Sequence, residues 1–125
     1  MFTIDEENTI SITRGDVGII EVRVDNVSGG QYIFKPGDVV RLKVFSKNRH
    51  DNIVIVKEVN VSEETEVVDV VLESNDTKIG SIINKPIDYW YELELNPDTN
   101  PQTIVGYDTD GAKIFRLYPE GGVIT

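Results

Sequence analysis

The single histidine, His50, is the first residue that could carry chemistry, and it lies in the most polar stretch of the chain, residues 47–52. A Ser-His-Asp triad needs a histidine held beside an activated nucleophile, and the sequence contains neither a nucleophile-elbow pattern nor any cysteine. Metal sites built on imidazole usually need a second ligand of that kind. We therefore expect His50 to be a solvated loop residue without a catalytic or metal-binding role.

Carboxylates are plentiful, with 22 Asp and Glu residues, so acid–base chemistry has to be judged from their surroundings. A general acid needs an apolar environment that raises its pKa. Asp69, between Val68 and Val70, comes closest, but strand alternation places it on the more polar face. The sequence thus predicts no catalytic residue and no cofactor, and we expect the protein not to be an enzyme; a hydrolase is the least favoured class.

Trp90 is followed at two-residue intervals by Glu92 and Glu94, so the three side chains would share one face of a strand. Acidic groups around an exposed aromatic ring can bind a sugar. The same tryptophan could instead pack under a neighbouring strand or anchor a protein interface. Whether Trp90 is buried or exposed stays open at this level.

Three short motifs have ordinary turn explanations. Asp108-Thr109-Asp110-Gly111 is similar to the opening of a calcium loop, but the later oxygen ligands are missing, and the residue types predict a hairpin turn. Arg14-Gly15-Asp16 matches an adhesion tripeptide, but so short a motif arises often by chance, and Gly-Asp before a strand is ordinary turn chemistry. Ser28-Gly29-Gly30 lacks the spacing and lysine of a phosphate-binding loop. We expect no metal site and no cofactor-binding site.

The elements that carry these residues are expected to be strands. Val and Ile together number 32, against five Leu and one Ala, and β-branched side chains favour sheets. The net charge of −10 argues against nucleic acid and anionic membranes as partners. No apolar run is long enough to cross a membrane, and the acidic N-terminus does not fit a secretory signal.

Period-2 alternation is clearest around Val22, Val44 and Val70, each flanked two residues away by further apolar side chains. Residues 53–56 are apolar on both faces, which predicts a central strand that is covered on two sides. The only helical turn is expected near residues 76–83. The pattern as a whole predicts a single all-β domain over 1–125, with its ordered core at about 8–118. We expect an antiparallel β-sandwich, immunoglobulin-like, of seven to nine short strands.

The order of landmarks along the chain adds a resemblance. Gly15-Asp16 and Gly37-Asp38 each precede an alternating strand, Asn75-Asp76-Thr77 follows a third, and residues 89–95 read Tyr-Trp-Tyr-Glu-Leu-Glu-Leu. Over about residues 8–118 this order resembles the N-terminal β-sandwich domain of the baseplate upper protein of phages that infect Gram-positive bacteria.

The resemblance implies a structural protein of a phage or prophage tail, with no catalytic residues, that docks onto other tail or baseplate proteins or onto itself. Such a protein would be assembled in the bacterial cytoplasm and located in the virion. Aromatic anchors are expected to carry the docking, and the candidates are Trp90, Tyr89 and Phe115. The alternative is a carbohydrate-binding module that recognises cell-surface glycan, in which Trp90 and a nearby tyrosine would be exposed and coplanar.

Overall fold

The computed structural model describes residues 1–24, 29–46, 49–105 and 113–120, and for residues 49–51 and 105 it describes the backbone alone. Within these ranges the chain forms nine strands and one four-residue helix. This confirms the expectation of a mostly β protein. The hairpin turn expected at residues 108–111 lies outside the described residues.

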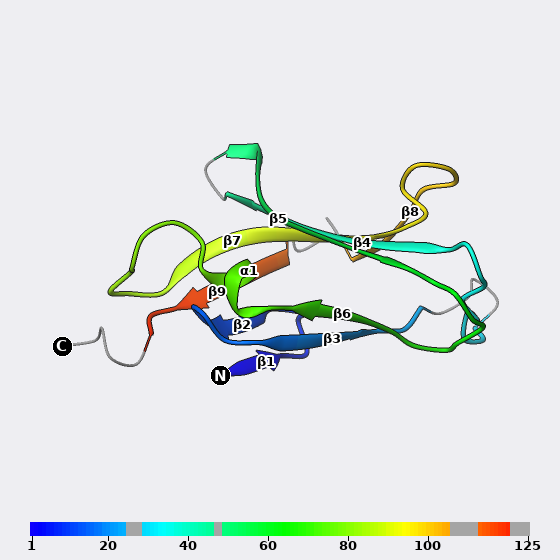
Figure 1. Ribbon diagram of the computed structural model, residues 1–125, viewed down its shortest axis with the longest axis horizontal. Helices are drawn as coiled ribbons and strands as arrows, with labels where there is room; N and C mark the ends of the chain where they lie inside the picture. Colours follow the sequence, from blue (N-terminus) through cyan, green and yellow to red (C-terminus); the bar gives the residue numbers. More distant parts are fainter. Residues whose placement is uncertain (25–28, 47–48, 106–112, 121–125) are drawn as a thin grey trace.

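Seven of the strands form one sheet, which occupies the upper layer and the left part of the molecule in Figure 1. Its order from edge to edge is β1 (Phe2–Ile4), β2 (Ile10–Thr13), β9 (Lys113–Tyr118), β7 (Ile87–Leu95), β4 (Val39–Ser46) and β5 (Arg49–Asn60). The short strand β8 (Gln102–Val105) pairs with the C-terminal end of β7. We call this seven-stranded sheet the large sheet.

The large sheet is mixed, and this corrects the expectation of a purely antiparallel fold. Strand β2 runs parallel to β9, with Ile10 opposite Phe115 and Thr13 opposite Tyr118. A parallel pair needs a long connection between its strands, and here nearly the whole domain separates them. No local sequence signal reports such a pairing.

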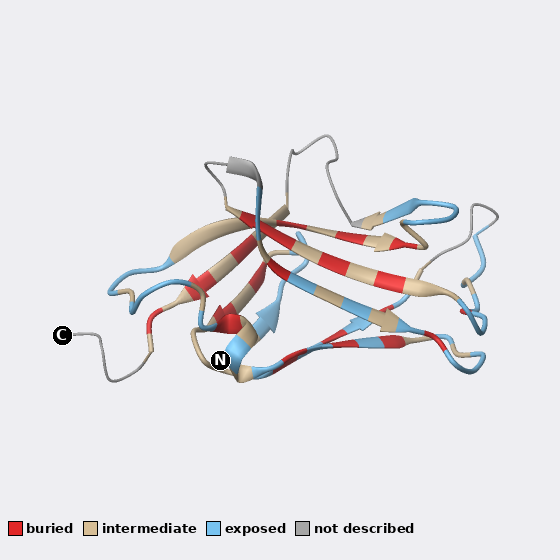
Figure 2. Ribbon diagram, turned by 45° about the horizontal axis from the view of Figure 1, so that its top comes forward, coloured by how far each residue is buried: buried red, intermediate tan, exposed pale blue. Residues whose placement is uncertain are grey.

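The small sheet consists of β3 (Gly18–Val22) and β6 (Val68–Leu72), which pair antiparallel beneath the large sheet (Figure 1). Alternate residues of both sheets are buried between them, as the red bands in Figure 2 show. The buried cluster includes Val22, Val44 and Val70, so the predicted alternation is confirmed at all three strands. The two sheets therefore close over one hydrophobic core.

Strand β5 is an edge strand, so the expectation of a central strand at residues 53–56 is wrong. Among the described residues it pairs with β4 alone, and Ile53 and Val56 are 43% and 51% exposed. Residues 49–52, expected as a loop, already belong to this strand. An apolar run cannot by itself distinguish a strand covered on two faces from an exposed edge.

The helix α1 (Ser74–Thr77) begins two residues before the expected position. Glu73 is its N-cap, and a capping box joins Glu73 and Asp76. Gly80, with φ of +64°, adopts a left-handed conformation shortly after the helix.

Candidate functional site

The site is built on the outer face of the large sheet, which is the face turned away from the small sheet. On β7, Tyr91, Leu93 and Leu95 are buried toward the core, so Trp90, Glu92 and Glu94 project from the outer face. This confirms the predicted division of the strand into two faces.

Trp90 belongs to an apolar row that crosses four neighbouring strands. It lies opposite Phe45 of β4 and Ile114 of β9, and Phe45 in turn lies opposite Ile53 of β5. Residues directly opposite one another project to the same face of a sheet. We call these four residues the Trp90 row. Phe45 is 6% exposed, Trp90 and Ile114 are half-buried, and Ile53 at the edge is exposed.

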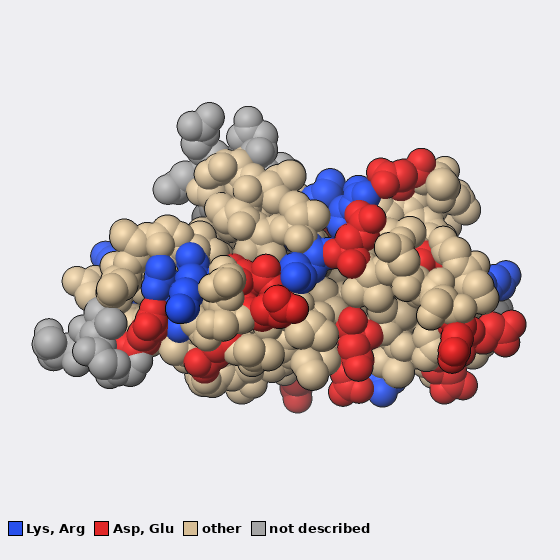
Figure 3. All heavy atoms as spheres, viewed as in Figure 1, with Lys and Arg blue, Asp and Glu red and all other residues tan. Residues whose placement is uncertain are grey.

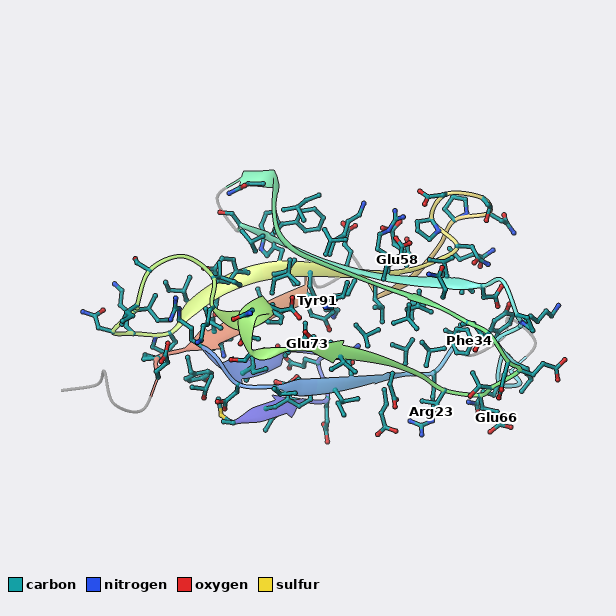
Figure 4. All side chains as sticks on the ribbon, viewed as in Figure 1. Arg23, Phe34, Glu58, Glu66, Glu73 and Tyr91 are labelled. Carbon is teal, nitrogen blue, oxygen red and sulfur yellow. The ribbon has the colours of Figure 1, made fainter. Side chains whose placement is uncertain are left out.

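Charged rows flank the Trp90 row on one side. Lys43 lies opposite Glu92, and Arg41 lies opposite Glu94 and Glu58. The Arg41 guanidinium binds Glu58 at 2.7 Å, and the Lys43 ammonium lies 3.7 Å from Glu94. In Figure 4 Glu58 stands on the upper side of β4 and β5, away from the core. Opposite charges therefore offset one another along this part of the face.

A second contact of Arg41 continues the charged row beyond the strands. Its guanidinium binds Asp98 at 2.6 Å, and this hydrogen bond and charge lower the pKa of the Asp98 carboxyl. On the other side of the Trp90 row, Arg116 binds Asp88 at 2.7 Å. The apolar row is thus bordered on both sides by ion pairs, which is the arrangement of an interface core within a polar rim.

The structure does not bring the three predicted anchors together. Tyr89 lies on the inner face, where it packs against the core, and burial raises the pKa of its hydroxyl. Phe115 is opposite Tyr89 and fully buried, so it belongs to the core and has no surface to offer a partner. Of the three, Trp90 alone projects from the outer face.

Three members of the row, Phe45, Ile53 and Ile114, were missed at the sequence level. The only local signal was Phe45, which follows inward-facing Val44 and therefore had to point outward. Register shifts flank Phe45 in its pairing with β5, and they bring Ile53 opposite it. Such a cross-strand register cannot be read from the sequence of either strand.

Neither tyrosine next to Trp90 on β7 is placed to stack on a sugar beside it. The expected partner of Trp90 was a nearby exposed tyrosine, but Tyr89 and Tyr91 both face inward. Tyr91 is 4% exposed, and its hydroxyl donates a hydrogen bond to the carbonyl of Asn8 between the sheets. Figure 4 shows Tyr91 pointing into the space between the two layers.

The other candidate residues have structural placements. Arg14 binds Glu120 and donates to the carbonyl of Gly80 at 2.8 Å, and Asp16 binds the N-terminal ammonium group, so the adhesion-like tripeptide is tied into the fold. Asp69 is exposed on β6, as alternation predicted. His50 lies in β5, not in a loop, and its side chain is not among those described.

Among the described residues, no three His, Cys, Asp or Glu side chains gather as a metal site would require. The same part of the chain contains no helix long and apolar enough to cross a membrane. No family model, no curated protein and no solved structure matches the chain.

Proposed function

We propose that this chain is a non-catalytic protein-docking domain that binds a partner protein through the Trp90 row. The observation that carries the proposal is the register that aligns four apolar side chains across β5, β4, β7 and β9 on an outer face. A sheet with one buried face usually has polar residues on the other. An apolar row on this face is therefore unusual, and a protein interface would account for it.

The composition of the row fits a binding hot spot. Tryptophan is enriched among the residues that carry most of the binding free energy, and such residues lie inside a ring of polar contacts that excludes water. Here the exposed end of the row, Ile53 with the neighbouring Val56, would provide the first contact, and the half-buried Trp90 the central one.

The resemblance described above extends this proposal to a biological setting. We infer that the partner is another tail or baseplate protein of a phage or prophage, that the chain is a virion component, and that the fold is an immunoglobulin-like sandwich. The common core of the two sheets supports the last point. Mass spectrometry of purified phage particles from the encoding strain should find the chain; particles without it would contradict the tail assignment.

Docking through the Trp90 row is tested with two matched substitutions. Ile53→Ser removes an exposed apolar side chain within the row, and Ile82→Ser removes one outside it that is 64% exposed. We expect Ile53→Ser to weaken binding to co-purified tail proteins roughly tenfold, since hot-spot truncations cost more than about 1 kcal/mol, and Ile82→Ser to leave it unchanged. Equal effects of both substitutions would contradict the proposal.

The glycan alternative is tested by fluorescence, because Trp90 is the only tryptophan in the chain. Titration with cell-wall polysaccharide up to millimolar sugar should leave its emission unchanged if the row docks protein. A saturable shift in emission that is absent with an unrelated polysaccharide would favour the carbohydrate-binding reading.

A further inference from the structure

The small sheet has only two strands, and this leaves one side of β6 without a strand partner among the described residues. Strand β5 lies near β6 but belongs to the large sheet. Backbone N–H and C=O groups along a free strand edge are ready to pair with another extended chain. Two-stranded sheets also gain stability when a third strand is added.

An open groove of about 340 Å³ borders the start of β6, next to the connection from β5. Its walls come from the end of β5, the β5–β6 connection and the start of β6, and the lining includes Val59, Val61, Val67, Glu63, Glu64 and Asp69. The walls thus combine valine side chains with polar and acidic ones. Figure 3 shows acidic side chains gathered over the right-hand part of this view, where β5 runs into β6.

The exposed face of the small sheet also combines apolar and acidic side chains. Ile19 lies opposite Val71, and both are exposed, at 50% and 38%. The next exposed pair is Glu21 opposite Asp69, which places two carboxylates side by side. Arg23 lies 3.7 Å from Glu21 and points away from the core in Figure 4. The described residues include no ion pair to Asp69.

We propose that an extended segment of a partner protein adds to β6 as a third strand of the small sheet, with a Lys or Arg side chain opposite Asp69. Because side chains directly opposite one another share a face, an apolar side chain two residues away would lie opposite Val71. The residue between them would lie opposite buried Val70 and would also be apolar. The partner segment would therefore read Lys or Arg followed by two apolar residues in a parallel pairing with β6, and the reverse order in an antiparallel pairing.

Charge complementarity selects this partner over a second copy of the chain. The net charge is −10, and two copies meeting at this face would bring Glu21 and Asp69 of each close to the same groups of the other. Strand addition is a recurring way to recognise extended peptides, in which the backbone supplies affinity and alternate side chains supply specificity. The inference goes beyond docking through the Trp90 row, because it concerns the other sheet.

The probe is a synthetic ten-residue peptide of Lys and Val that contains the segment Val-Val-Lys-Val-Val, and in the comparison peptide Gly replaces every Val. Both peptides carry the same charge, but Gly weakens strand formation. We expect the Lys–Val peptide to bind more tightly and to slow hydrogen exchange at alternate amides of residues 68–72. Equal affinities, without such protection, would show that charge alone attracts the peptides and would overturn the proposal.

Matched substitutions locate the contact. Glu21→Gln with Asp69→Asn should weaken binding of the Lys–Val peptide roughly fivefold to tenfold, as expected for the loss of two exposed charge pairs. Glu6→Gln with Glu7→Gln removes the same net charge at exposed positions in the turn after β1, and should have less than about a twofold effect. Equal losses in the two double variants would overturn the proposal.

N-methylated peptides test whether backbone hydrogen bonds hold the added strand. N-methylation of every second residue of the Lys–Val peptide should abolish binding in one of the two alternate frames and spare it in the other, because an added strand uses alternate N–H groups. Equal binding in both frames would overturn strand addition. Trp90→Phe should leave binding of this peptide unchanged whether or not the Trp90 row docks a protein, so the two proposals fail independently.

Discussion

Glu21 and Asp69 lie directly opposite each other on β3 and β6, and both carboxylates face solvent. Like charges in directly opposed positions destabilise an antiparallel pair. The free domain therefore keeps an unfavourable contact on a surface that we assign to a cationic partner. Contacts that lower the stability of the free protein are common at surfaces that serve binding.

Removal of one of these charges should stabilise the free protein. Asp69→Asn is expected to raise the free energy of unfolding by about 0.5 kcal/mol and the melting temperature by about 2 °C. Glu66→Gln, which removes a charge outside the two strands, is the control. The gain should shrink in high salt because exposed charges are screened. Destabilisation by Asp69→Asn would show that the opposed carboxylates do not repel significantly.

Asp76 joins α1 to the edge of the large sheet. Its carboxylate accepts the N–H of Glu73 at 2.8 Å and binds the Lys57 ammonium at 3.1 Å. Asp76→Ala should lower the free energy of unfolding by about 1–2 kcal/mol through loss of the helix cap and the ion pair. Asp76→Asn keeps an acceptor for Glu73 and should cost less. If both variants lost the same free energy of unfolding in chemical denaturation, the effect would come from the charge of Asp76 alone.

Lys57 also protects the β5 edge. Residues Ile55 and Lys57 share the inward side of β5, so Lys57 places a charge at the rim of the core. Inward charges at edge strands discourage pairing with other chains. Lys57→Met should therefore promote concentration-dependent self-association, measured by light scattering, while Lys35→Met, on an exposed turn, should not. A monomeric Lys57→Met protein at high concentration would contradict this role.

Thr77 is fully buried at the end of α1 and connects the helix to the turn before β3. Its hydroxyl accepts the N–H of Gly15 at 2.9 Å and donates to the carbonyl of Asp16 at 3.0 Å. Thr77→Val keeps the shape but leaves both backbone groups without this partner, which should cost about 1–3 kcal/mol. Thr77→Ser keeps the hydroxyl and should cost less; the reverse order in thermal unfolding would show that the methyl group dominates.

The pKa of the Asp38 carboxyl determines part of the loss of folding stability in acid. Burial alone would raise the pKa of its carboxyl, but hydrogen bonds from the Lys35 N–H, the Tyr32 hydroxyl and the Asn96 amide, together with the Lys35 charge, lower it further than burial raises it. A pKa lowered in the folded state gives stability that is present above the unfolded value, about 3.9, and is lost as the pH falls through the folded value.

The measurement compares wild-type protein with Asp38→Asn between pH 7 and pH 2. The destabilisation caused by the substitution should be largest near neutral pH and should diminish below about pH 4, as the wild-type carboxylate becomes protonated. Other carboxylates titrate equally in both proteins and cancel in the difference. A difference that does not vary with pH would show that the charge of Asp38 contributes nothing to stability.

The sequence alone determined the inner and outer faces of the strands with clear alternation. Alternation placed Val40, Leu42 and Val44 in the core, and all three are fully buried. It also divided β7 correctly around Trp90. The turn at Lys35–Asp38 also depends on local residues, because Pro-Gly favours a type II turn, and Gly37 has the required positive φ of 95°. These features depend on residues close together in the chain.

The tertiary structure decided which strands became neighbours. The parallel pairing of β2 with β9, the edge position of β5 and the alignment of Phe45 with Trp90 each join segments distant in sequence. The outer apolar row and the opposed carboxylates of the small sheet arise from that alignment. A strand's own residues fix which way its side chains point, whereas their neighbours are fixed by the packing of the whole core, which no single strand encodes.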